Sequence, residues 1–141
     1  MSKHLHGYHL VHIEKGCNGE PSKIIEEIIE LIDAESQNAK IMALIEISDL
    51  IGSIELYIDK YEIQYALDKE FFNAPPSTSK QILFFAEKLD NSFDNETRME
   101  VIDSLFKSIC GYIQNKFKGI SLEDILIMKN ITKRAFINGR R

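Results

Sequence analysis

The sequence predicts an all-α protein, a bundle of about five to six helices. Helix breakers are rare, with 7 glycines and 3 prolines among 141 residues. Apolar residues recur at helical spacing along most of the chain, and strict alternation over the length of a strand is hard to find. The length suits one modest hydrophobic core, so we expect a single domain over residues 1–141.

Three helices are expected in the N-terminal half. The first covers Leu5–Glu14, and Gly16 stops this helix and begins a loop. Ser22 is the expected N-cap of a second helix over Lys23–Ser36. A third helix runs from about Ala39 to Tyr61 or beyond.

The segment Asn73–Ser79 separates this half from the next. It contains two adjacent prolines, which cannot lie in a helix interior. After it we expect a short helix over Ser79–Leu89 and a long helix over Glu96–Lys116 with Asn95 as its cap. A last helix is expected from Ser121 to near Gly139.

Composition excludes several classes of protein. The net charge is −5, and residues 20–70 hold thirteen acids and four bases, whereas affinity for nucleic-acid phosphates needs clustered Lys and Arg. No apolar stretch approaches the ~20 residues of a membrane span. The chain starts without the apolar region of a signal peptide, so we expect a cytoplasmic protein. Cys17 and Cys110 form no C-x-x-C pair and are interpreted as ordinary thiols.

Acidic residues mark one face of the second expected helix. Glu26, Glu27, Glu30 and Asp33 lie opposite a broad face of isoleucine and leucine. On this helix alone, the simplest interpretation is an amphipathic helix whose acidic side meets water.

The third expected helix favours a different interpretation. From Ile41 to Ile54 its only charged residues are Glu46 and Asp49, so the helix should be buried. Their i, i+3 spacing places both carboxylates on one side. Burying a carboxylate without a partner is costly, and basic residues are scarce on these two helices. A divalent cation is the simplest partner.

The second helix can supply more ligands to the same cation. Glu27 and Glu30 share the i, i+3 spacing of Glu46 and Asp49, so two antiparallel helices could direct four carboxylates into one space. Oxygen ligands of this kind suit Mg²⁺ or Mn²⁺ better than zinc.

Other known site types do not fit. A di-iron bundle needs Glu-x-x-His on two helices, but all four histidines precede residue 13. His9 and His12 could share a helix face, and we interpret them as packing or solvent contacts in preference to metal ligands. The sequence has no P-loop and no glycine-rich dinucleotide motif.

The acidic motifs carry a family resemblance. Glu26-Glu27-x-x-Glu30, followed after fifteen residues by Glu46-x-x-Asp49, resembles the E-E-x-x-E and E-x-x-D pair of the all-α nucleoside triphosphate pyrophosphohydrolases, the MazG-like superfamily. The stretch KIIEEIIELIDAESQNAKIMALIEISDLIGSIELYI is similar to small MazG-like proteins of bacteriophages and some bacteria. The closing SLEDILIMKNITKRAFINGRR is similar to their C-terminal helix. The resemblance covers about residues 8–60 and 119–141, and residues 62–118 match no family motif.

The resemblance implies a reaction and a set of roles. Glu27, Glu30, Glu46 and Asp49 would bind Mg²⁺, and Glu26 would help to activate water or hold a further metal. The reaction would split an NTP or dNTP between its α and β phosphates, giving the nucleoside monophosphate and pyrophosphate. Members of the superfamily generally form dimers or higher oligomers, so we expect a homo-oligomer.

Basic residues are candidates for contacts with the nucleotide. Lys129 and Lys133 lie on one stripe of the last expected helix and could bind phosphates, although the helix dipole also favours positive charge at such a C-terminal surface. Lys15 and Lys23 flank the loop before the first motif and are further phosphate candidates. Asn130 could contact the base or sugar.

Two alternatives stay open. One is a non-catalytic helical interaction protein on the same fold, since the unmatched middle segment carries the pairs Phe71-Phe72 and Phe84-Phe85, which could form core or an interface. The other is phosphoribosyl-ATP pyrophosphohydrolase, a relative with the same fold. No motif determines the base or the sugar of the substrate.

Overall fold

A computed structural model describes residues 9–65, 74–120 and 124–127, and these are helical over most of their length. The all-α prediction is confirmed, and no strand occurs within these ranges. The four long helices are α1 (Pro21–Ser36), α2 (Lys40–Lys60), α3 (Ser79–Asp90) and α4 (Asn95–Lys116). Residues 124–127 are also helical and lie within the expected last helix, whose other residues fall outside the described ranges.

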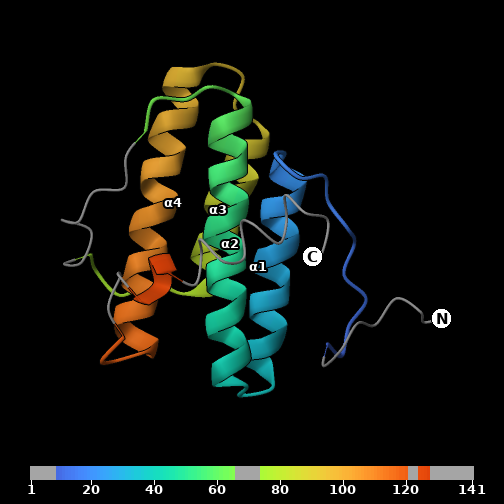
Figure 1. The fold of residues 1–141 in the computed structure, drawn as a ribbon, viewed down its shortest axis with the longest axis vertical. Helices are drawn as coiled ribbons and strands as arrows, with labels where there is room; N and C mark the ends of the chain where they lie inside the picture. Colours follow the sequence, from blue (N-terminus) through green and yellow to red (C-terminus); the bar gives the residue numbers. More distant parts are fainter. Residues whose placement is uncertain (1–8, 66–73, 121–123, 128–141) are drawn as a thin grey trace.

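The long helices lie side by side as a bundle (Figure 1). α1 packs against both α2 and α3, and α3 packs against α4. Residues 37–39 join α1 to α2 and make these two helices antiparallel neighbours. Asn38 has a φ of 56° in this turn, a left-handed conformation that asparagine tolerates better than most residues.

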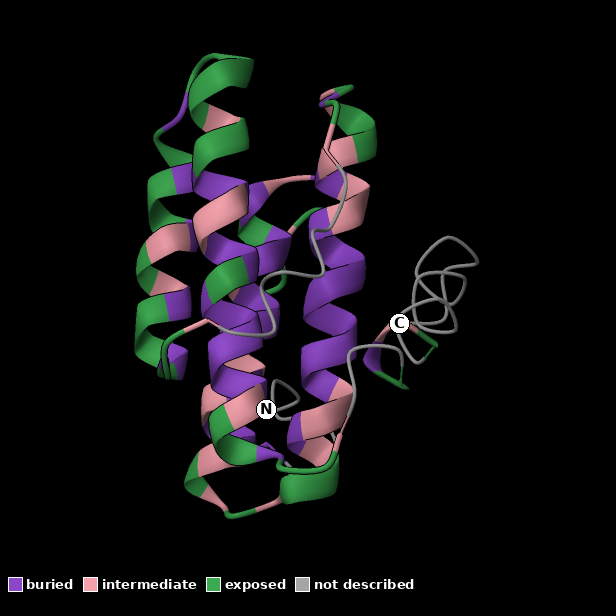
Figure 2. Cartoon of the chain, turned by 90° about the vertical axis from the view of Figure 1, so that its left-hand side faces the viewer, coloured by how far each residue is buried: buried purple, intermediate pink, exposed green. Residues whose placement is uncertain are grey.

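One hydrophobic core runs through all four helices. Buried residues occupy the facing sides of the helices, and exposed residues occupy their outer sides and ends (Figure 2). α2 is buried without a break from residue 46 to residue 54, so the prediction that this helix is buried is confirmed. The fully buried core side chains include Ile24, Ile28, Leu31, Ile47, Leu50, Ile54, Ile82, Ala86, Ile102 and Leu105.

The helix bounds agree with the sequence predictions to within a few residues, but two predicted caps are wrong. α1 begins at Pro21 with Glu20 as N-cap, because proline suits the first helical position. Ser22 therefore lies inside the first turn, where its hydroxyl accepts a hydrogen bond from the Cys17 N–H at 3.0 Å. The N-cap of α4 is not Asn95 but the residue before it, Asp94, which accepts a 2.8 Å hydrogen bond from a first-turn N–H.

The helix expected over residues 5–14 is contradicted where it can be compared, since residues 9–20 contain no helix. This segment instead runs along the outside of α1 (Figure 1). The N–H groups of Leu10 and Gly16 donate to the carboxylates of Asp33 and Glu26 on α1, at 3.1 and 2.8 Å. Hydrogen bonds to charged acceptors thus replace the helical ones that the local pattern predicted.

None of the described helices combines the length with the hydropathy that crossing a bilayer requires.

A glycine in α4 allows the chain before α3 to approach closely. A Cβ atom added at Gly111 would lie 2.1 Å from the Pro75 carbonyl oxygen, which is too short for any contact. Helix propensity alone would make alanine at this position more stable by about 1 kcal/mol.

We therefore predict that Gly111→Ala lowers the free energy of unfolding by about 1 kcal/mol or more, since the overpacking cost exceeds the propensity gain. Urea denaturation measures this change. Lys107→Ala, at an exposed position of the same helix, should change stability by less than about 0.5 kcal/mol. A stabilised Gly111→Ala would contradict the close approach of α4 to Pro75.

Candidate metal centre

Several acidic side chains of α1 and α2 are buried. Glu26, Glu27, Asp33, Glu46 and Asp49 are each only 2–5 % exposed. The interpretation of the acidic side of α1 as a surface facing water is therefore wrong. Carboxylates are rarely buried unless they are paired or bind a cation, so this arrangement needs compensating groups.

The carboxylates predicted from sequence converge in overlapping groups. Oxygen atoms of Glu27, Glu46 and Asp49 lie within 4.8 Å of one another, which joins α1 to α2. Glu30 does not complete this group but lies in two others, one with Glu26 and Glu27 and one with His9 and Glu46. The antiparallel packing of α1 and α2 thus brings all four predicted ligands into connected groups.

The acids of these groups, Glu26, Glu27, Glu30, Glu46 and Asp49, form one acidic cluster. Lys23 lies inside this cluster. Its side chain is nearly buried, and Nζ lies 3.1 Å from both Glu26 Oε1 and Glu27 Oε2. Burial by itself would lower the pKa of Lys23, but the charges of Glu27 and Glu26 outweigh it and leave the pKa raised. The ammonium group that the sequence suggested for phosphate contact thus pairs with two carboxylates. Lys15, the other basic candidate of this region, is exposed.

Glu26 and Glu27 differ in how their oxygens are satisfied. Glu26 Oε1 accepts hydrogen bonds from the Gly16 N–H at 2.8 Å and from Lys23 at 3.1 Å. Glu27 contacts Lys23 through Oε2, whereas its buried Oε1 has no hydrogen-bond partner among the described residues. The neighbouring Glu30 carboxyl is hydrogen-bonded to Glu27, and a cation bound by both carboxylates would satisfy this oxygen in place of that proton.

The charge of the cluster affects Glu30 most clearly. Burial, followed by the negative charges of Glu27, Glu46 and Glu26, raises the pKa of Glu30 from its ordinary value near 4.5 to about 10. Without a cation, the Glu30 carboxyl therefore keeps its proton at neutral pH. A bound cation would favour the ionised form and release this proton.

His9 belongs to the same cluster, which the sequence analysis did not predict. The imidazole is 7 % exposed, with Nδ1 2.8 Å from Asp33 Oδ2 and Nε2 3.4 Å from Glu46 Oε2. The assumed helix over residues 5–14 suggested packing or solvent contact for this histidine. Twenty-four residues separate His9 from Asp33, and no local pattern indicates such a contact.

The basic and polar candidates near the C-terminus, Lys129, Asn130 and Lys133, lie outside the described residues.

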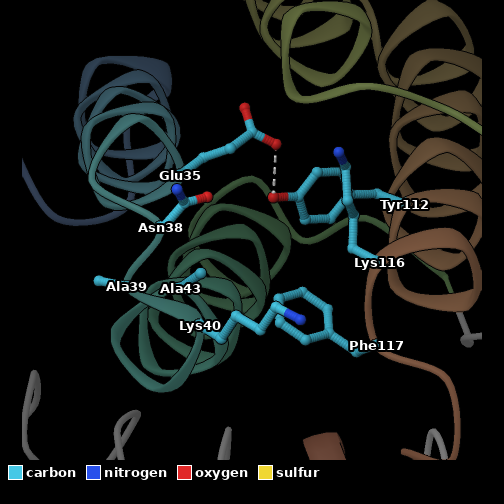
Figure 3. Close-up of a pocket in the computed structure, with 8 residues that line it drawn as sticks. All are labelled: Glu35, Asn38, Ala39, Lys40, Ala43, Tyr112, Lys116 and Phe117. Carbon is cyan, nitrogen blue, oxygen red and sulfur yellow. Dashed lines mark hydrogen bonds between the residues drawn. The ribbon is translucent and has the colours of Figure 1, made fainter.

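A separate pocket lies where the α1–α2 turn meets the C-terminal end of α4 (Figure 3). Its volume is about 130 Å³, and Lys40, Lys116 and Phe117 contribute to its lining. Glu35 in this pocket accepts hydrogen bonds from Tyr112 at 2.9 Å and from Ser79 at 2.8 Å, which connects α1 to α4 and α3. The acids of the α1–α2 cluster do not line this pocket, so the two features are distinct.

Comparisons of the chain with protein-family models, with curated proteins and with solved structures find no match.

The raised pKa of Glu30 predicts how stability depends on pH when no metal is present. Between about pH 4.5 and about pH 10 the folded state keeps a proton that the unfolded state has released. Stability should therefore fall as pH rises through this range, by up to about 1.4 kcal/mol per pH unit for one proton.

The glutamine of Glu30→Gln cannot ionise. In EDTA, the free energy of unfolding of this variant should therefore not fall with pH through this proton, and the variant should be more stable than the wild type at about pH 8–9. Denaturant unfolding at several pH values measures the free energy of unfolding of both proteins. Glu87→Gln, at an exposed position of α3, should follow the wild-type pH dependence. Parallel curves for all three proteins would mean that Glu30 titrates normally.

Proposed function

We propose that the chain is a Mg²⁺-dependent nucleotide pyrophosphohydrolase, with Mn²⁺ as an alternative cofactor, which hydrolyses an NTP or dNTP to the nucleoside monophosphate and pyrophosphate. One observation carries the proposal: Glu27 of α1 and Glu46 and Asp49 of α2 bring carboxylate oxygens within 4.8 Å of one another in a buried interface. The resemblance of these acids to the paired MazG-like motifs supplies the reaction.

The chemistry of the donors fits Mg²⁺ or Mn²⁺. The Glu27, Glu46 and Asp49 group consists of carboxylate oxygens, the ligands that these ions prefer. Glu27 Oε1 is buried and accepts no hydrogen bond from the described residues. Lys23 and His9 cannot balance the five carboxyl groups of Glu26, Glu27, Glu30, Glu46 and Asp49, and the protonation of Glu30 still leaves an excess of negative charge. A divalent cation would remove this excess.

In the proposed mechanism, Mg²⁺ would neutralise phosphate oxygens and lower the pKa of a bound water. The protein supplies position and proton transfer. Glu27, Glu46 and Asp49 would hold the cofactor, with Glu27 oriented by Lys23. Glu30 would exchange a proton at its carboxyl group as the charge of the site changes. Glu26 would help to activate the attacking water, and its hydrogen bonds from Gly16 and Lys23 support a fixed position for that carboxylate.

Several finer features are part of the proposal. Lys129, Lys133 and Lys15 would contact phosphates, and Asn130 would contact the base or sugar. Lys23 would act on phosphate only indirectly, because its ammonium group pairs with Glu26 and Glu27. We also propose a cytoplasmic homodimer or higher oligomer, as the resemblance implies.

A second candidate function is that of a helical interaction protein. Phe84 is 55 % exposed and Phe93 is 84 % exposed. Phe84 lines a surface groove between α3 and α4, together with Lys88 of α3 and Val101 of α4. A partner protein that docked here would bury these side chains. A protein that binds metal and turns over no nucleotide, phosphoribosyl-ATP included, would favour this function.

Mg²⁺ or Mn²⁺ should raise the melting temperature, because the cation binds the folded state and relieves repulsion within the acidic cluster. At a metal concentration 100 times the dissociation constant, the gain in stability is about 2.7 kcal/mol. Glu46→Gln should lose most of this gain, since Glu46 belongs to two of the three groups. Thermal unfolding with EDTA and with each metal measures it.

The matched control is Glu87→Gln, which removes one carboxylate from an exposed position and should respond to metal like the wild type. An equal response of Glu46→Gln and wild type would exclude Glu46 as a ligand.

The second test of the proposal asks which bond is cleaved. A panel of ribo- and deoxyribonucleotides is incubated in H₂¹⁸O with Mg²⁺, and both products are analysed by mass spectrometry. Attack at the α phosphorus places ¹⁸O in the monophosphate and none in pyrophosphate. Label in pyrophosphate would indicate attack at the β phosphorus. Primary release of orthophosphate would also contradict the mechanism, with Glu46→Gln as the control for contaminating enzymes.

A further inference from the structure

His9 is held in one orientation by Asp33. Asp33 Oδ2 lies 2.8 Å from His9 Nδ1 and also accepts hydrogen bonds from the Leu10 N–H at 3.1 Å and Gln37 Nε2 at 3.0 Å. These contacts hold the imidazole with Nδ1 toward Asp33 and leave Nε2 on the opposite side of the ring.

The Nε2 atom faces the acidic cluster. It lies 3.4 Å from Glu46 Oε2 and 3.7 Å from Glu30 Oε2, and the three residues form a group whose ligand atoms lie within 4.8 Å of one another. A carboxylate that fixes the tautomer of an imidazole from behind is the usual support of a metal-binding histidine. His9, with Asp33 behind it and Glu30 and Glu46 in front, has this arrangement.

The donor set of this group differs from that of the neighbouring group. Glu27, Glu46 and Asp49 offer oxygen atoms alone, whereas His9, Glu30 and Glu46 offer one nitrogen and two oxygens. Imidazole nitrogen favours first-row transition metals over Mg²⁺. Glu46 belongs to both groups, so two cations could share its carboxylate.

We propose that His9, Glu30 and Glu46 form a second cation position, oriented by Asp33 and selective for Mn²⁺ or Co²⁺ over Mg²⁺. This inference rests on the proposed function, because it concerns the cofactors of the same acidic centre. It assigns His9 as a direct nitrogen ligand and Asp33 as the residue that positions it.

If His9 were only a counter-ion, it would not bind the metal. A protonated imidazole would act only as a counter-ion for Glu30 and Glu46, and a cation would then displace it from the cluster. In that case no metal-bound nitrogen exists, so magnetic spectroscopy of a bound ion separates the two roles.

The experiment uses the whole chain loaded with Mn²⁺ and pulsed electron paramagnetic resonance, which detects ¹⁴N bound to the ion. The wild type should show imidazole ¹⁴N coupling. A variant with His4, His6 and His12 all changed to Gln should keep the coupling, since His9 is then its only histidine. His9→Gln should lose it.

Calorimetric titration gives a second measurement. His9→Gln should bind Co²⁺ at least ~10-fold more weakly and Mg²⁺ as well as the wild type does. Asp33→Asn keeps the imidazole but weakens its support, and should cost about 10-fold in Co²⁺ affinity. His12→Gln, the matched control from the same segment, should bind both ions normally.

Bound Mn²⁺ without ¹⁴N coupling in the wild type, or coupling that persists in His9→Gln, overturns the role of His9 and leaves the proposed function intact. Absence of any Mn²⁺ or Mg²⁺ binding overturns both. If His9→Gln does not fold, the wild type and the variant that keeps only His9 still decide the question.

Discussion

The buried carboxylates of α1 and α2 determine how the surrounding segments pack. Five of these acids are nearly inaccessible to water, and a buried charge persists only where cations or hydrogen-bond donors meet it. Lys23 and His9 supply two partners, and the backbone N–H groups of Leu10 and Gly16 supply others. The course of residues 9–20 along α1 follows from these contacts.

The other helices complete the hydrophobic core that α1 and α2 begin. α3 packs against α1, and α4 packs against α3. Glu35, whose carboxylate accepts hydrogen bonds from Ser79 and Tyr112, connects three helices on another side of α1. α3 and α4 thus support α1, one of the two helices that carry the acidic centre.

Local signals in the sequence predicted most of the helices and four acids of the cluster. The burial of α2 followed from its apolar composition, and the meeting of Glu27, Glu46 and Asp49 followed from i, i+3 spacing on antiparallel neighbours. Contacts between distant residues could not be predicted in this way. The donors of residues 9–16 bind carboxylates that lie ten to 24 positions further along the chain, and these bonds replaced the expected helix. The same contacts placed His9 in the cluster, and ion pairing directed Lys23 inward.

Anomalous X-ray diffraction from crystals grown with Mn²⁺ locates bound metal directly. If the buried acids form a metal centre, a manganese peak will lie among the carboxylates of Glu27, Glu46 and Asp49. Under the same conditions, crystals that show manganese only at exposed acids of the surface, or none in the α1–α2 interface, would contradict it.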